Sequence, residues 1–460
     1  MILTWLWLIP LVGAALTAFT HRCVAIAGSL GALGFAIAAA MKFDAAGPKY
    51  QLVQEHSWIG AIHANYLVGV DGIALVMVLL TAALVPLLLI ATDSRGQSAL
   101  MLLAESMVLL SFVSLDLLLF YVMFEAMLIP LYFLIARGDS RAAMKFLLFN
   151  LLGGLLMLAA VIGVYVQATT FDTRVIDLAG TDSGLLRAMF AGFMFAFAVK
   201  APLWPLHTWL PGAAVAAPPP AAVLMMAIID KVGTFGMIRY CLPLFGDSAR
   251  HFGTLVMTLA VISIIYGALV AIGQTDILRL IAYTSISHFG FIVLGIFAMS
   301  SQSQTGAVFY MVNHGISTAA LFLVAAALTA RAGTARIGAF GGVAQVAPKL
   351  AGVFLVSGLA TLALPGLAPF VSEFLVLVGT YRTHPVPAIF ATAALVLSAV
   401  YILWLYQRVF GGPARIAVPD LRIREVAVLA PLIVGLVVLG CYPKPALDVI
   451  SPAVETTVAK

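Results

Sequence analysis

Long apolar runs recur from one end of the chain to the other, separated by short polar stretches. Most runs approach the roughly 20 residues that a helix needs to cross a bilayer. The pattern predicts an all-α polytopic membrane protein with about fourteen transmembrane helices. We expect these near residues 3–20, 23–41, 67–91, 98–115, 117–136, 143–167, 186–210, 218–242, 254–273, 277–299, 304–330, 349–380, 387–410 and 427–445.

Two of the long runs contain helix breakers. Pro202 and Pro205 interrupt the first, and Pro365, Gly366 and Pro369 interrupt the second. Interrupted helices in corresponding positions of two halves are typical of inverted-repeat transporters. We therefore expect a single membrane domain over 1–460, with a first repeat at about 98–242, a second at about 254–410 and flanking helices at both ends. The longest polar stretches, about 42–66 and 168–185, are expected to be loops outside the bilayer.

The composition narrows the class of protein. Hydrophobic residues make up 63% of the chain and charged residues only 9%, which excludes a soluble domain of this length. The net charge of +5 is spread over loops without a dense Lys/Arg cluster, so we expect lipid headgroups and neighbouring subunits as partners and no nucleic acid. Because the first span has no basic segment ahead of it and further spans follow, we interpret it as a retained helix, not a cleaved signal.

The sequence offers no pattern for a cofactor. Cys23, Cys241 and Cys441 are isolated from one another, so they lack the spacing of a zinc or iron–sulfur site. Neither a Walker motif nor a strand followed by G-x-G-x-x-G is present. We expect no metal, nucleotide or redox centre in this chain, so the energy for any driven process must come from a gradient or a partner.

Lys200 is the most informative residue, because it lies in an apolar stretch just before Pro202 and Pro205. A charged group at a helix centre costs about 2.5–3.5 kcal/mol on insertion scales. A broken membrane helix that carries an ionisable group is typical of an ion path. Glu125, isolated within FYVMFEAMLIPLYFLI, must be protonated, paired or hydrated. It could be hydrogen-bonded to a neighbouring helix for structural reasons, or it could pair with Lys200.

Two more ionisable residues lie within later apolar runs. Lys231 follows Asp230, and the two could mark a helix end at the membrane surface. The apolar run over 223–242 favours instead an interior lysine that carries protons. Glu373 lies inside the second broken helix, at a place comparable to that of Lys200 in the first. It could cap a half-helix, or it could form a water-filled exit for a proton beside unwound backbone.

Histidines add to this polar set. His288 and His314 lie within spans, where histidine can relay protons, although each could also be a satisfied core residue. His314 is the stronger candidate, because Asn313 and Ser317 could hold water around it. Further embedded groups, which could form interhelical pairs or meet a neighbouring subunit, are Glu105, Asp116 and Lys145. A polar chain across the centre of a membrane indicates a proton path.

Five segments resemble a known family, in order and at matching intervals, over about 71–450. They are FYVMFEAMLIPLYFLI, VKAPLWPLHTWLP, QTDILRLIAYTSISHFGF, LPGLAPFVSEF and GCYPKPALDVI. These segments are similar to the antiporter-like chain M of bacterial respiratory NADH:quinone oxidoreductase (complex I), the counterpart of mitochondrial chain 4. The resemblance implies fourteen helices with two inverted five-helix repeats, each containing a broken helix. It also implies a place in the membrane arm, where redox chemistry in distant subunits drives proton pumping.

The resemblance also implies an assembly and a set of residues. The chain would be a subunit of a translocase in the bacterial inner (plasma) membrane, beside other membrane-arm subunits that include antiporter-like neighbours. NADH, FMN, iron–sulfur clusters and quinone would belong to partner subunits. The residues that match positions for proton translocation are Glu125, Lys200, Lys231 and Glu373, with Glu105, His207 and His314 as further matches, and His288 joins them by its place in a span. Several relatives carry lysine at the place of Glu373, whereas chain M carries glutamate.

The chain departs from the family pattern after HTWLP. The family usually reads Asp-Ala-His-x-Glu-Ala-Pro-Thr there, whereas residues 212–220 read GAAVAAPPP. The positions that have lost polar or charged groups are Gly212, Ala214, Ala216, Leu278 and Ala330. Two alternatives therefore remain beside proton pumping in complex I. One is a subunit of an Mrp-type cation/proton antiporter or of a membrane-bound hydrogenase, and the other is a structural membrane-arm subunit that no longer conducts.

Overall fold

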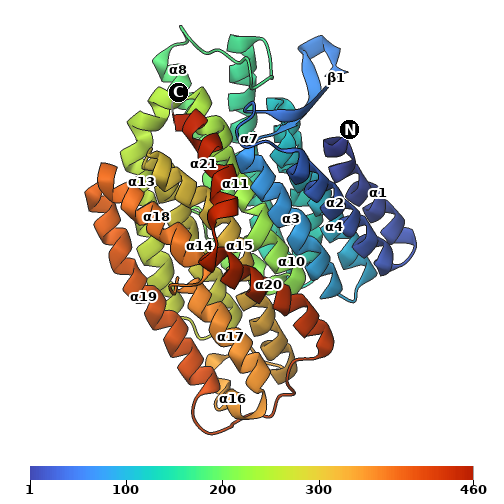
Figure 1. The fold of residues 1–460 in the computed structure, drawn as a ribbon, viewed down its shortest axis with the longest axis vertical. Helices are drawn as coiled ribbons and strands as arrows, with labels where there is room; N and C mark the ends of the chain where they lie inside the picture. Colours follow the sequence, from blue (N-terminus) through green and yellow to red (C-terminus); the bar gives the residue numbers. More distant parts are fainter. Residues whose placement is uncertain (459–460) are drawn as a thin grey trace. The chain divides into compact units, whose positions relative to one another are not determined.

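The computed structural model describes residues 1–458, whose helices and strands are drawn in Figure 1. The chain divides into two compact units. Unit 1 contains residues 1–202 and 228–254 and the C-terminal segment from 448 onward. Unit 2 contains residues 203–227 and 255–447. Each unit thus combines segments that are distant in the sequence, and each has its own buried polar cluster.

Unit 1 is built from the N-terminal helices and a hairpin. Its elements are α1 (Ile2–Phe19), α2 (Arg22–Lys42), β1 (Gln51–Ile59), η1 (Gly60–Ile62), β2 (Ala64–Val70), α3 (Gly72–Ile90), α4 (Arg95–Val113), α5 (Leu117–Ala126), α6 (Leu128–Ala136), α7 (Ser140–Ala168), α8 (Ser183–Lys200), α11 (Lys231–Gly236), η3 (Met237–Cys241), α12 (Leu242–Leu244) and most of α21 (Lys444–Val458).

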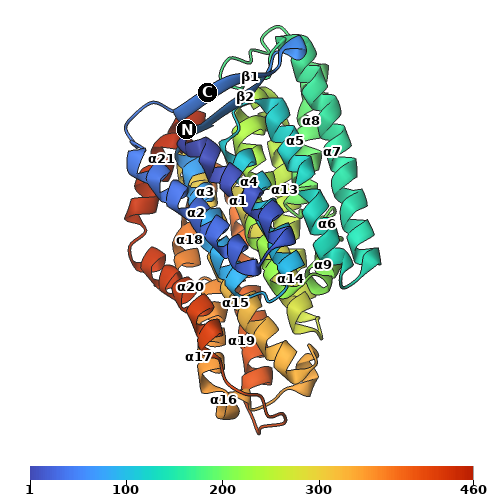
Figure 2. The same ribbon diagram turned by 90° about the vertical axis from the view of Figure 1, so that its right-hand side faces the viewer.

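Small residues let the helices of unit 1 pack closely. The buried face of α2 consists of Ala25, Gly28, Ser29, Ala32, Ala36 and Ala39. Each of them has another member of the set three or four residues away, as one face of a helix requires. Such faces let membrane helices approach closely. Helices α1 and α2 pack together, and so do α7 and α8, which run side by side in Figure 2.

Our expectation of a loop over about 42–66 is wrong for most of that stretch. Strands β1 and β2 pair there in antiparallel fashion (Figure 2). β2 is largely buried and β1 largely exposed. The amide of Leu115 also donates a hydrogen bond of 2.9 Å to the carbonyl oxygen of Leu67, so the segment between α4 and α5 covers the edge of β2. Tertiary contacts of β2, which hydropathy does not reveal, explain why this polar stretch is ordered.

Unit 2 contains the rest of the helices. They are α9 (Leu210–Ala216), α10 (Pro219–Leu224), most of η2 (Met225–Ile229) and of α13 (Gly246–Ile272), α14 (Ile277–Phe297), α15 (Ser301–Ala332), η4 (Ile337–Ala339), α16 (Val343–Val346), α17 (Pro348–Thr361), α18 (Ala368–Thr383), α19 (Pro385–Phe410) and α20 (Ile423–Cys441).

The long helix α15 forms the centre of unit 2. It packs against α14, α17, α18 and α20. Gly306 permits the contact with α18, because a Cβ at that position would lie 2.7 Å from the backbone nitrogen of Val376. Gly379 of α18 also permits this contact, because a Cβ at that position would meet the backbone of Ser303 in α15. These close approaches fix the start of α15 against α18.

The predicted membrane spans agree with the helices. Among the described residues, thirteen helical runs are long and apolar enough to cross a membrane. The remaining predicted span, 349–380, is divided into α17 and α18, each shorter than the others. Between them lies the predicted breaker segment, with Ala363 and Gly366 at positive φ. The first predicted break is also present, since α8 ends at Lys200 and α9 begins only at Leu210.

Candidate functional site

Lys200 is the last residue of α8 and is 1% exposed. The helix ends there because Pro202 has no amide hydrogen and disfavours helical geometry at Ala201. The Lys200 Nζ donates a hydrogen bond of 3.0 Å to the carbonyl oxygen of Phe124, and it lies 4.0 Å from the centroid of the Phe124 ring. A carbonyl oxygen and an aromatic face both stabilise a cation. The buried ammonium group is therefore held against α5.

Glu125 directly follows Phe124 and interacts electrostatically with Lys200. Its Oε1 is buried without a hydrogen-bond partner among the described residues. Gly154 of α7 provides the space for this carboxylate, since a Cβ at that position would overlap Oε1. The structure thus brings the predicted Glu125–Lys200 pair together. The direct hydrogen bond of the lysine goes to the neighbouring carbonyl group, so the carboxylate acts on it through charge.

Lys231 is 0% exposed and Asp230 is 1% exposed, and both lie near the middle of the apolar helical run Pro219–Leu244, which is long enough to cross a membrane. Two π-helical turns, η2 and η3, flank the short helix α11 that begins at Lys231. Gly233 permits α11 to contact the end of α8, because a Cβ there would lie 3.0 Å from the backbone nitrogen of Ala201. Lys231 is therefore on a helix that packs directly beside the residue after Lys200. π-Helical turns of this kind occur frequently at functional sites.

The other charged residues of unit 1 that we expected within the membrane are Glu105, Asp116 and Lys145, and each has different surroundings. Glu105 is completely buried and accepts a hydrogen bond of 2.9 Å from Ser29 of α2. Asp116 caps α5, where it accepts a hydrogen bond from the Leu119 amide. Lys145 is exposed on α7. Glu105 thus joins two helices, and Asp116 fixes the start of the helix that carries Glu125.

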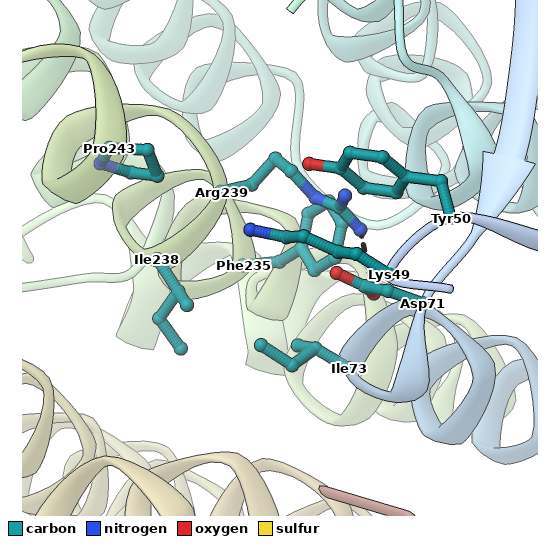
Figure 3. Close-up of a pocket in the computed structure, with 8 residues that line it drawn as sticks. All are labelled: Lys49, Tyr50, Asp71, Ile73, Phe235, Ile238, Arg239 and Pro243. Atoms are coloured by element: carbon teal, nitrogen blue, oxygen red, sulfur yellow. Dashed lines mark hydrogen bonds and ion pairs between the residues drawn. The ribbon is translucent and has the colours of Figure 1, made fainter. Parts of the chain in front are cut away.

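Unit 1 also contains a buried ion pair (Figure 3). Arg239 Nη2 lies 2.8 Å from Asp71 Oδ1, and both side chains are nearly buried. The guanidinium carbon lies 5.2 Å from the Tyr50 ring centroid and 5.1 Å from that of Phe235, so it is held between two aromatic faces. Lys49 lines the same small pocket. Because breaking a buried pair leaves an uncompensated charge, this contact fixes η3 to the start of α3.

Unit 2 contains a connected polar chain. Glu373, 4% exposed on α18, interacts with the hydroxyl group of Tyr310 on α15. The same Tyr310 oxygen lies 2.6 Å from Nδ1 of His288 on α14. The His288 and His314 ring centroids are 5.4 Å apart. A glutamate, a tyrosine and two histidines from three helices thus form a connected set of proton-exchanging groups.

Asn313 and Ser317, which we expect to hold water around His314, also form hydrogen bonds within the protein. The Asn313 amide donates hydrogen bonds to the Ala368 carbonyl oxygen, at 2.9 Å, and to the Ser372 hydroxyl oxygen, at 3.3 Å. The Ser317 hydroxyl donates to the carbonyl oxygen of His314. Asn313 therefore holds the first turn of α18, just after the helix break and one turn before Glu373.

His207 lies in the interruption between α8 and α9 and is 2% exposed. Its ring packs against that of Tyr266 on α13, with 5.0 Å between the centroids. The amide of Trp204 donates a hydrogen bond of 2.6 Å to the Ser263 hydroxyl oxygen. Two contacts with α13 thus fix the interruption within unit 2.

Three buried residues have no proton-carrying role in our predictions from the sequence: Asp230, Arg239 and Tyr310. Asp230 interacts electrostatically with Lys200 and Lys231, and Tyr310 lies beside His288, whereas Arg239 pairs with Asp71. The charges of Asp230 and Arg239 within the apolar run 218–242 were a usable signal, whereas a tyrosine in an apolar helix is indistinguishable from an ordinary core residue. Among the described residues, no group of three His, Cys, Asp or Glu side chains is arranged to hold a metal ion.

Comparisons with known proteins agree with the motif resemblance. Residues 114–398 match the family model described as NADH:quinone oxidoreductase/Mrp antiporter, TM. NADH-quinone oxidoreductase subunit M of Mycobacterium tuberculosis is 53% identical, with 99% of this chain and 93% of the relative covered. NADH-ubiquinone oxidoreductase chain 4 of Marchantia polymorpha is 34% identical over 91% of this chain and 88% of its own length. A chain in the structure of respiratory complex I from Thermus thermophilus with bound NADH superposes with a TM-score of 0.94 at 31% identity, covering 100% of this chain and 99% of that one.

Proposed function

Because the chain belongs to the family of NADH:quinone oxidoreductase and Mrp antiporter membrane subunits, we propose that it translocates protons as a membrane-arm subunit of a respiratory NADH:quinone oxidoreductase. One observation supports this proposal most strongly. A completely buried lysine, Lys200, ends an interrupted membrane helix within reach of a carboxylate charge. Such a group is costly in a membrane unless it is used.

The residues of the two units have separate roles in this proposal. In unit 1, Lys200 and Lys231 exchange a proton, and Glu125 changes its attraction to Lys200 as the complex cycles. In unit 2, Glu373 delivers the proton toward one membrane surface, with Tyr310, His288 and His314 as the connected relay. Glu105 and His207 are further candidates for proton translocation. Moving one charge across the membrane requires about 2.3 kcal/mol per 100 mV, so a partner must supply energy.

The energy source in this proposal is quinone reduction in partner subunits. NADH, FMN, the iron–sulfur clusters and quinone are bound there, and this chain contributes the proton path. Its neighbours are other membrane-arm subunits, including antiporter-like ones, in the inner membrane of a bacterium. The subunit M relative at 53% identity supports a bacterial enzyme.

Two alternatives carry less support. An Mrp-type antiporter or hydrogenase subunit would share the fold, but the relatives reported above bear subunit M or chain 4 names. A non-conducting structural subunit is favoured only by the segment with Gly212, Ala214 and Ala216, where α9 lacks charged side chains.

The proposed coupling is tested with membrane vesicles that contain the assembled complex. We expect NADH oxidation to acidify the vesicle interior, and the acidification to disappear when quinone reduction is inhibited. A sodium gradient alone should move no protons. Sodium-driven proton movement without NADH would contradict the proposal and favour the antiporter alternative.

Gly154 offers a test of the position of Glu125. In Gly154→Ala, the added methyl group overlaps Glu125 Oε1 and must displace the carboxylate from Lys200. Misplacement of a reacting group by about 1 Å can cost about 100-fold in rate, so we expect strongly reduced NADH-driven acidification in an assembled complex.

The matched control is Gly352→Ala in α17, where a Cβ would meet no atom within 4 Å. The control should pump normally. Equal pumping by both variants would show that the position of Glu125 is unimportant.

A further inference from the structure

Asp230 is a buried carboxylate that the roles described above do not use. It is 1% exposed, and its Oδ2 is buried without a hydrogen-bond partner among the described residues. A buried ionised carboxylate without compensation is strongly unfavourable. The compensation available here is positive charge, since Asp230 interacts electrostatically with both Lys231 and Lys200.

The usual structural roles of an aspartate at a helix start do not account for this residue. Asp230 precedes α11, yet its side chain makes no capping hydrogen bond. It does not mark a membrane surface, because the apolar run continues on both sides and every residue from Pro220 to Cys241 is buried. A purely structural carboxylate would also be expected to have both oxygens bonded.

The backbone near Asp230 brings the two lysines into its surroundings. The π-helical turn η2 ends at Ile229, immediately before Asp230, and α11 packs against the end of α8 at Gly233. The Asp230 carboxylate is thus next to Lys231 in the sequence, and it also interacts with the charge of Lys200. Lysine amines and a carboxylate in one buried site can exchange a proton without creating an additional net charge.

We propose that Asp230 is a proton-carrying residue that shares a proton between Lys200 and Lys231. This inference rests on the proposed function and deepens it. When an N–H bond of the Lys200 ammonium breaks, an O–H bond forms on the Asp230 carboxylate, leaving a neutral amine and a neutral acid. That O–H bond then breaks as an N–H bond forms on the neutral amine of Lys231. One proton has moved, and the carboxylate is restored.

The inference is tested in the assembled complex with Asp230→Asn and Asp230→Glu. Asp230→Asn keeps the size of the side chain but cannot carry a proton, so we expect NADH-driven acidification to fall at least about tenfold. Asp230→Glu should retain pumping. The exposed Asp247→Asn, whose carboxylate forms a surface ion pair with Arg250, is the matched control and should pump normally.

Infrared difference spectra of reduced against oxidised complex separate a proton carrier from a simple counterion. A carrier gives a carboxylic acid C=O band that disappears in Asp230→Asn and moves in Asp230→Glu. If Asp230→Asn does not assemble, the position of the band in Asp230→Glu still shows whether the side chain at position 230 carries a proton. Unchanged bands in these variants, or normal pumping by Asp230→Asn, would overturn the inference. Normal pumping by Lys200→Ala would instead overturn the proposed function itself.

Discussion

Substitution of Lys200 by alanine is expected to abolish proton delivery through this chain while the complex still assembles. The change removes the ammonium group that the Phe124 carbonyl oxygen and aromatic ring hold in place, so no group remains at that position to accept the transferred proton. Loss of a positioned acid or base typically costs about 100- to 10,000-fold in rate. The measurement is NADH-driven acidification of vesicles, alongside quinone reduction and the amount of assembled complex.

Two companion variants control for structural effects of this change. Lys200→Met keeps most of the side-chain volume without the charge, and it should fail in the same way as Lys200→Ala. Lys145→Ala removes an exposed lysine from α7 in the same unit, and it should pump normally. If Lys200→Met pumps well while Lys200→Ala does not, the side chain matters for its volume and not for its charge.

Substitution of Glu373 in unit 2 by glutamine is expected to reduce NADH-driven acidification about as strongly as the loss of Lys200. Glutamine has nearly the same volume and keeps a polar group beside Tyr310, but it cannot bind and release a proton. Proton release should therefore stop, and acidification should fall by about two orders of magnitude.

The control for this variant is Glu455→Gln, which changes an exposed carboxylate in α21. A second variant, Tyr310→Phe, removes the hydroxyl group between Glu373 and His288. We expect it to slow acidification without changing assembly. Normal acidification in Glu373→Gln would remove this glutamate from the path and leave the connected chain of unit 2 without a function.

Hydropathy was sufficient for most of the fold because each membrane helix must satisfy its own backbone hydrogen bonds and present apolar side chains. The bounds of α1, α5–α6, α14 and α19 differ from the predicted spans by only a few residues. The hairpin over 51–70 was missed because its order depends on contacts with the segment after α4. Such contacts between distant parts of the chain have no local signature.

The candidate site was predictable where charge conflicts with an apolar environment. Lys200, Lys231 and Glu373 stand out in the sequence for this reason, and all three are buried. Their partners were harder to predict. The hydrogen bond from Lys200 to a backbone carbonyl group and the link from Tyr310 to His288 depend on helix packing.

If the buried lysine of unit 1 carries protons, its loss must change the number of protons moved per NADH oxidised. The ratio is measured in vesicles with wild-type, Lys200→Ala and Lys145→Ala complexes at matched rates of quinone reduction. We predict a lower ratio for Lys200→Ala than for the wild type, and an unchanged ratio for Lys145→Ala. An unchanged ratio in an assembled Lys200→Ala complex would show that the buried lysine is architectural and carries no protons.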